Sequence, residues 1–221
     1  VGSEMCIRDR HGLDTALAAI SASSSNQKPM NPKPIFLSNP TGKSTLVDEY
    51  VAKKSLEKYG LKIPKTEKCL LSDAHFVSDQ IGYPVVLKAL GSAHKSEMGE
   101  VVLNLENKKA VKNASKKISK KNVIIEKMID DTIVELLIGI VHDPAHGMLL
   151  TIGAGGILTE ILSDTSSLLL PSSEDDVLEC FNQLKISKIA KGYRGFSGVD
   201  VNQIVDAIMK IQEFVLDNRD K

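Results

Sequence analysis

Residues 135–164, ELLIGIVHDPAHGMLLTIGAGGILTEILSD, carry the pattern that decides the fold. Two apolar segments of strand length, residues 134–141 and 148–152, lie on either side of the turn sequence Asp-Pro-Ala-His-Gly. The second segment runs directly into a glycine-rich turn, Gly-Ala-Gly-Gly, at residues 153–156. The stretch therefore predicts two strands and a turn whose backbone can approach a neighbouring group closely.

Strand and helix patterns mix along the rest of the chain. Further strands are predicted at residues 66–71, 85–90, 100–105 and 123–129. Helices are predicted at residues 11–22, 44–59 with Ser44 as N-cap, 72–81, 107–121, 172–185 with Ser172 or Ser173 as N-cap, and 201–216. The strands at 85–90 and 100–105 predict a hairpin around the loop 91–99. Because hairpins occur together with crossovers, the pattern indicates an α+β fold rather than a parallel βαβ series.

The first 41 residues differ in composition from the rest. Residues 1–10 contain arginine, whereas the rest of the chain is rich in lysine. They also lack the apolar segment of a signal peptide, so we interpret them as a non-native prefix. A genuine flexible N-terminus is the alternative. Residues 11–41 combine a short helical pattern with a stretch rich in Ser, Asn and Pro, which predicts the end of a preceding domain and a linker. The main domain is predicted at residues 42–221.

The composition excludes several classes of protein. The chain has 28 Lys and Arg against 28 Asp and Glu, which argues against a dedicated nucleic-acid or membrane-surface protein. No apolar run approaches the roughly 20 residues that span a bilayer. Three widely spaced cysteines without CxxC spacing fit a reducing cytoplasm rather than a disulfide framework or a zinc site.

Three features suit a phosphate site, and each has a purely structural alternative. Lys88 ends the apolar strand VVLK, where it could offer a point charge to phosphate oxygens or simply reach solvent. His94 lies in the glycine-flanked loop and could accept a phosphoryl group, or belong to an ordinary polar loop. Backbone N–H groups of the turn at 153–156 could bind an anion, and the acids Glu160 and Asp164 that follow suggest a cation or a ribose. The alternative for the last feature is a tight turn.

Three other motifs favour the structural reading. The Gly-Lys-Ser sequence at residues 42–44 lacks the first glycine of a P-loop, because position 37 is Leu. The lysine-rich stretch 108–121 has no interleaved aromatic residue, and its lysines fall mostly opposite an apolar face of Val111, Ala114 and Ile118. We therefore interpret it as a solvated helix face. His142 and His146 have a spacing that would suit a metal on a helix, but the Pro and Gly around them favour a turn.

Together these segments resemble the ATP-grasp domain of NDP-forming acyl-CoA synthetases, which include ADP-forming acetate–CoA ligases. The matching stretches are residues 49–64 (EYVAKKSLEKYGLKIP), 81–105 (IGYPVVLKALGSAHKSEMGEVVLNL), 123–128 (VIIEKM), 135–164 and 192–195 (GYRG). They occur in the family's order and spacing. The resemblance implies an ATP-grasp fold of two α+β subdomains. The smaller would span about 64–126, and the larger would combine 42–63 with 127–221.

The resemblance also implies a reaction in which acid, CoA and ATP are interconverted with acyl-CoA, ADP and phosphate. The cofactors would be ATP or ADP and Mg²⁺, and a phosphohistidine would carry the phosphoryl group between two sites. CoA and a small carboxylic acid would bind through CoA-ligase domains outside this chain, in the cytoplasm, without nucleic acid or membrane. The chain could form an oligomer, and the resemblance does not fix its oligomeric state.

Roles for single residues follow from the same resemblance. Lys88 matches the lysine that contacts the nucleotide phosphates, and His94 matches the loop histidine that takes the phosphoryl group. Glu126 matches a residue near the adenine, and Glu135 matches an acid that faces the nucleotide. The glycine loop is matched by Gly153, Gly155 and Gly156, with Glu160 behind it. Lys95 adds positive charge beside the histidine, which phosphoryl transfer requires. No metal ligand is assigned.

The chain also departs from the family's pattern. Family members continue into a strand with an E-x-N-P motif that holds magnesium, so we expect a fragment that is truncated at its C-terminus and inactive by itself. Position 100 is Glu where many members have a small residue. The alternatives are a succinyl-CoA synthetase β-like or other ATP-grasp ligase, a non-catalytic nucleotide-binding module of a protein acetyltransferase, and a lysine-rich scaffold.

Overall fold

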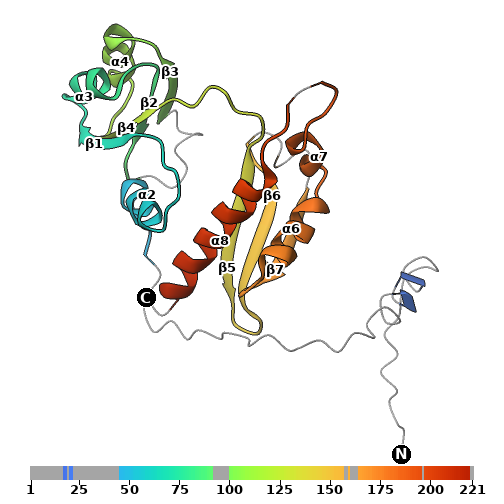
Figure 1. The fold of residues 1–221 in the computed structure, drawn as a ribbon. Coiled ribbons are helices and arrows are strands. Elements are labelled where there is room, and N and C mark those ends of the chain that lie inside the picture. The colour runs from blue at the N-terminus through green and yellow to red at the C-terminus, as the bar shows by residue number, and fades with distance from the viewer. Residues whose placement is uncertain are drawn as a thin grey trace, which may run out of the picture. The chain divides into compact units, whose positions relative to one another are not determined.

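The computed structural model describes residues 17, 18, 20, 21, 45–91, 100–156, 159, 164–195 and 197–219. The chain divides into two units, Val1–Pro34 and Ile35–Lys221, and everything below concerns the second. The described part of that unit contains two antiparallel sheets with helices, which confirms the α+β class (Figure 1).

The first sheet has four strands in the order β1-β4-β2-β3, and all neighbours are antiparallel. Its strands are β1 (Thr66–Leu70), β2 (Val85–Ala89), β3 (Val101–Leu105) and β4 (Asn122–Lys127). All four were predicted, with boundaries within two residues. The direct antiparallel pairing of β2 with β3 confirms the predicted hairpin.

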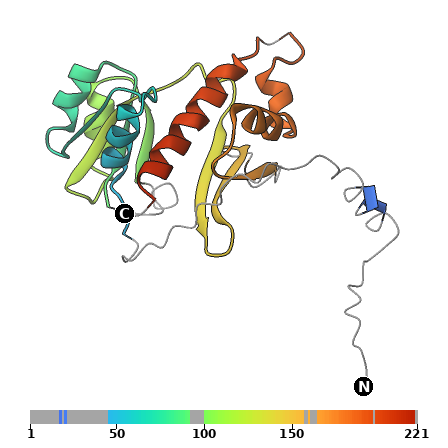
Figure 2. The ribbon, with the colours of Figure 1, turned by 60° about the horizontal axis from the view of Figure 1, so that its bottom comes forward.

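Two helices, α3 (Ala74–Ile81) and α4 (Lys108–Ser115), cover one face of this sheet (Figures 1 and 2). The α4 helix is shorter than the predicted 107–121. Asn107 caps it by accepting a hydrogen bond from the amide of Ala110, which is a standard N-cap contact. The apolar face predicted for this segment is confirmed, because Val111, Ala114 and Ile118 are all buried.

The second sheet has three strands in the order β5-β6-β7, again antiparallel. They are β5 (Leu136–Asp143), β6 (Gly147–Ala154) and β7 (Thr165–Leu169). Strand β7 was not predicted, because the Thr-Ser-Ser sequence at its start breaks the apolar alternation that marks a strand.

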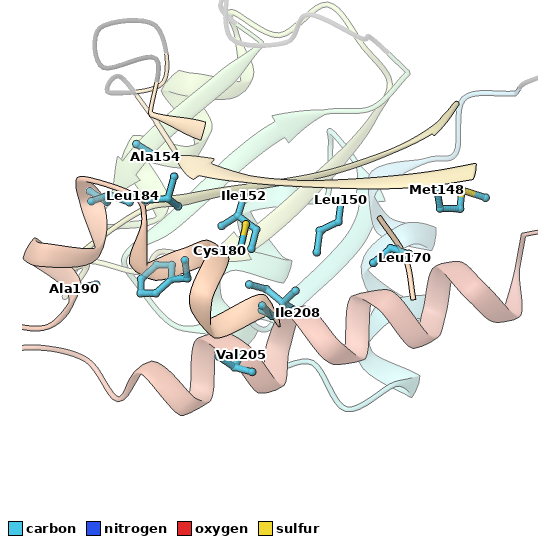
Figure 3. Packing of buried hydrophobic residues seen from close by; sticks show 13 residues of the cluster. Met148, Leu150, Ile152, Ala154, Leu170, Cys180, Leu184, Ala190, Val205 and Ile208 are labelled. Atoms are coloured by element: carbon cyan, nitrogen blue, oxygen red, sulfur yellow. The ribbon is translucent and has the colours of Figure 1, made fainter. Parts of the chain in front are cut away.

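Three helices accompany the second sheet, and Figure 3 shows labelled side chains of β6 directed toward two of them. The helices are α6 (Glu174–Asn182), α7 (Ile186–Ala190) and α8 (Val201–Asp217). The core between them contains Phe181, Leu150, Ile152 and Ile208, each at most 1% exposed. The helix predicted at 172–185 is shorter, because it ends at Asn182, and the short helix α7 that follows was not predicted. Of the two candidate N-caps, Ser172 and Ser173, the second forms a full capping box with Asp176.

The remaining helix, α2 (Glu49–Lys58), begins five residues after the predicted N-cap Ser44. Asp48 caps it instead, accepting a hydrogen bond from the amide of Tyr50 at 2.9 Å. At the other end of α2, the ring of Tyr59 meets that of Phe214 in α8 edge to face, and its hydroxyl donates to Asp217 at 3.1 Å. Among the described residues, no helix combines the length and the apolar character that a membrane span requires.

Candidate functional site

Lys88 and Glu126 lie on neighbouring strands of the first sheet. The register pairs Val86 with Glu126 and Lys88 with Ile124, so the two charged residues are diagonal neighbours on one face. Long side chains reach across such a diagonal. The Lys88 ammonium donates to Glu126 Oε1 at 3.1 Å, and the two side chains are 19% and 10% exposed. The structure therefore brings together two residues that the sequence analysis named for separate roles.

Helix α2 adds a second acid and a second lysine to this pair. Glu49 and Lys53 are four residues apart, so they face the same side of the helix, and their charged groups are 3.1 Å apart. Lys88 Nζ donates to Glu49 Oε1 at 3.0 Å, and Lys53 Nζ donates to Glu126 Oε2. The four side chains form a closed ring in which each ammonium contacts both carboxylates. We call this the charge ring.

The charge ring favours the charged form of two of its members, Glu126 and Lys88. Burial by itself raises the pKa of Glu126, but the hydrogen bond from Lys53 and the nearby Lys88 charge outweigh it, and the pKa is lowered. Burial likewise lowers the pKa of Lys88, but Glu49 and Glu126 outweigh it, and the pKa is raised. Thr66 also donates to Glu126 Oε2 at 3.1 Å. Lys88 therefore stays charged, as a phosphate contact requires, while the two carboxylates balance its charge in the ring.

Glu49 and Lys53 were absent from the predicted site. Their only signal in the sequence is an acid and a lysine at helical spacing, which is common on solvated helices. The local sequence does not show that Glu49 contacts Lys88, 39 positions away. It also does not show that Lys53 contacts Glu126, 73 positions away.

The glycine-rich turn lies against Glu135, so a second group of predicted residues is also brought together. A Cβ on Gly155 would lie 2.9 Å from the carbonyl carbons of Glu135 and Leu136, and one on Gly156 would collide with the Glu135 carboxylate. A Cβ on Gly153 would meet Thr165 and the Asp164 carbonyl oxygen. The glycines are thus required by close approach, with φ of +60° at Gly156 as a further constraint.

The prediction that this turn offers free amides to an anion is wrong at two positions. The Ala154 amide donates to the Asp164 carbonyl oxygen at 3.1 Å, and the Gly155 amide donates to the Glu135 carbonyl oxygen at 2.7 Å. Backbone polar groups are satisfied wherever a partner is near, and here neighbouring strands supply one. What the turn does present to solvent is the exposed side chain of Glu135.

Asp164 also differs from expectation. Its two carboxylate oxygens accept hydrogen bonds from the amides of Lys185 and Ile186, at 2.9 and 2.8 Å. The residue is 8% exposed and anchors the start of α7. Asp164 therefore has a structural role in place of the suggested contact with a cation or a ribose.

Three predicted site residues, His94, Lys95 and Glu160, lie outside the described residues, so their roles stay predictions. His142 lies on strand β5 and His146 lies in the turn between β5 and β6, so this segment is a hairpin and not a metal-binding helix. His146 Nδ1 contacts Asp143 Oδ1 at 2.9 Å within that turn. In the part of the chain that the structure describes, no group of three or more His, Cys, Asp or Glu could hold a metal.

Comparison with known proteins places these features in a family. A family described as an ATP-grasp domain matches residues 40–220. The β subunit of ADP-forming acetate–CoA ligase II from Pyrococcus furiosus is 31% identical over 193 residues, which cover 81% of this chain and 81% of that protein. ADP-forming acetate–CoA ligase II from Archaeoglobus fulgidus is 33% identical over 180 residues, 77% of this chain. The match spans 26% of that longer protein.

Solved structures agree with the sequence relatives. The dinucleotide-forming acetyl-coenzyme A synthetase 1 of Ca. Korarchaeum cryptofilum, in complex with coenzyme A and Ca-AMPCP, superposes with a TM-score of 0.70 at 30% identity. That match covers 78% of this chain and 81% of the other. A second structure of that synthetase, with Mg-AMPPCP and a phosphohistidine segment pointing towards the nucleotide binding site, gives 0.65 at 30% identity over 76% and 78% of the chains. The chain therefore belongs to the ATP-grasp family, in the group of the ADP-forming acetate–CoA ligase β subunits.

Proposed function

We propose that this chain provides the nucleotide-binding part of an NDP-forming acyl-CoA synthetase. The whole enzyme would interconvert a carboxylic acid, CoA and ATP with acyl-CoA, ADP and phosphate. The observation that carries the proposal is Lys88, held on β2 by two carboxylates so that its ammonium is charged and fixed in direction. A fixed charge of this kind stabilises the negative charge that spreads over the phosphoryl oxygens during transfer.

We also propose roles for the other candidate site residues. Glu126 orients the Lys88 ammonium through its carboxylate, and its proximity to the adenine remains an expectation from the resemblance. His94 would accept the phosphoryl group and Lys95 would add charge beside it, on the loop that follows β2. Glu160 would lie behind the glycine turn. The relatives' division into subunits supports a larger assembly, in which CoA and the acid bind outside this chain.

Magnesium would enter with the nucleotide and neutralise charge on the phosphates. An ion bound in this way takes most of its oxygen ligands from phosphate and water, with one or two protein carboxylates. Glu135 fits that need, because its side chain is exposed at the glycine turn and Gly156 leaves it room. Glu135 would then be the protein's contribution among the described residues.

A cytoplasmic location also belongs to the proposal. The two cysteines that the structure describes, Cys69 and Cys180, are free thiols. Burial, together with the nearby carboxylates, raises the pKa of Cys69 to about 11, so this thiol stays protonated and unreactive at neutral pH.

Calorimetric titration of the chain with ADP and Mg²⁺ tests the proposal. Lys88→Gln should weaken binding about tenfold, because a charge-assisted contact to phosphate contributes about 1.5 kcal/mol or more. Lys108→Gln is the matched control, since it removes the same charge from an exposed lysine that pairs with Asp79. Absence of binding by the unmodified chain, or equal affinities for both variants, would contradict the proposal.

The phosphohistidine step needs its own measurement. The full-length gene product, incubated with γ-labelled ATP and Mg²⁺, should carry acid-labile label on histidine. His94→Ala should reduce that labelling, whereas His146→Ala, in the exposed β5–β6 turn, should leave it unchanged. Unchanged labelling in the His94 variant would remove this residue from the reaction.

A further inference from the structure

The charge ring is electrically neutral, which is unusual for a place where a phosphate is to bind. Two lysines face two glutamates, and four ion pairs close the ring: Lys88 to Glu49 and Glu126, and Lys53 to the same two acids. Both ammonium nitrogens contact one atom, Glu49 Oε1, at 3.0 and 3.1 Å. An anion that approaches Lys88 therefore meets a cation whose charge is already balanced at short range.

The geometry of the ring leaves the lysines with capacity to bind another group. An ammonium has three N–H donors, and the ring uses two on each lysine. Exchange of one carboxylate for a phosphate oxygen would conserve the number of charge-assisted hydrogen bonds. The question is which of the two acids can leave.

Glu126 is poorly suited to leave the ring. Its side chain is 10% exposed, it lies on the central strand β4, and it also accepts a hydrogen bond from Thr66. Displacing it would leave a buried carboxylate without its ammonium partners, and an uncompensated buried charge is strongly unfavourable.

Glu49 is well suited to leave. It is the most exposed member of the ring, at 28%, and it is the first residue of α2. The helix would keep its place when this happens, because Asp48 caps α2 and pairs with Lys68 of β1 at 3.1 Å. Removal of Glu49 from the ring leaves two lysines and one glutamate, a net charge of plus one that attracts phosphate.

We propose that Glu49 is a built-in competitor of the nucleotide, whose carboxylate occupies Lys88 and Lys53 until a phosphate group displaces it. In this scheme Lys53 becomes a second phosphate contact, because its ammonium contacts the same Glu49 oxygen as the Lys88 ammonium does. The inference rests on the proposed function, because it assigns the regulation of the same nucleotide site. Its consequence is that the chain binds nucleotide more weakly than its two lysines would allow.

The test is a calorimetric titration of the full chain with ADP. Glu49→Gln keeps the shape of the side chain but removes its charge, and it should tighten binding about two- to fivefold, because partly exposed ion pairs contribute up to about 1 kcal/mol. Glu57→Gln is the matched control, since Glu57 lies in the same helix, its replacement removes the same charge, and it pairs with Lys54 in an exposed position. Its affinity for ADP should equal that of the unmodified chain.

A second variant guards against a folding defect in the first. Glu49→Asp keeps the charge at the start of α2 but is too short by one methylene to contact both lysines, so it should also tighten ADP binding. Weaker or unchanged binding in both Glu49 variants would overturn the inference while leaving the proposed function intact. Failure of the unmodified chain to bind ADP would instead overturn the proposed function, and the two failures are thereby distinguished.

Discussion

The two sheets of this protein are alike on one face and different on the other. Each packs one face against helices through an apolar core, with α3 and α4 over the first sheet and α6 and α8 over the second. The other face of the first sheet carries buried Val86 and Ile124 beside the charge ring, to which α2 contributes Glu49 and Lys53. The second sheet leaves Leu137, Val141 and Leu169 more than 40% exposed. Charge is concentrated where a helix shields it, because ionic contacts gain strength away from water.

The largest effect is expected in the apolar core of the second sheet. Phe181 is fully buried there, and Phe181→Ala should lower the free energy of unfolding by about 3–5 kcal/mol, because lost burial adds to the cavity left behind. Urea unfolding followed by circular dichroism measures this change. A loss below 1 kcal/mol would mean that this core does not carry the stability of the region.

A smaller effect is expected where the second sheet meets its glycine turn. Gly155→Ala places a Cβ 2.9 Å from two backbone carbonyl carbons, which cannot move aside easily, so it should destabilise by about 1–3 kcal/mol. Gly139→Ala in β5 is the control, since no atom lies within 4 Å of its added Cβ. Thermal melting of both variants gives the comparison, and equal melting temperatures would contradict close approach as the reason for Gly155.

The charge ring should make stability depend on pH in a defined direction. The pKa of Glu126 is lowered on folding, so its contribution is complete above the unfolded pKa of about 4.3 and is lost as the pH falls through the folded value. Urea unfolding at a series of pH values should show a shallower acid-side decline for Glu126→Gln than for the unmodified chain. Parallel declines would mean that the ring does not hold this carboxylate ionised.

The smallest effect is expected for an ion pair of the same helix outside the ring. Lys54 pairs with Glu57 at 3.0 Å, but both side chains are more than 40% exposed. Lys54→Gln should leave the urea midpoint within experimental error, because exposed pairs are screened by water and salt. A clear loss of stability would show that helix α2 is held by more than the charge ring and its contacts with α8.

Local pattern was sufficient for most elements of the fold. The four strands of the first sheet, the lysine face of α4 and the cap at Ser173 were all predicted, because hydrophobic period and capping chemistry act over a few residues. The elements that were not predicted correctly have different causes. Strand β7 is short and polar at its start, and the start of α2 depends on Asp48, which also pairs with Lys68 from another element.

The sequence by itself determined that Lys88 ends an apolar strand, that a glycine turn follows another, and that the whole resembles an ATP-grasp domain. Only the tertiary structure decided that Lys88 meets Glu126 and Glu49, residues 38 and 39 positions away, and that Ala154 and Gly155 use their amides internally. The physical reason is distance along the chain. Strand register and helix docking bring remote charges and carbonyls together, and neither leaves a trace in local periodicity.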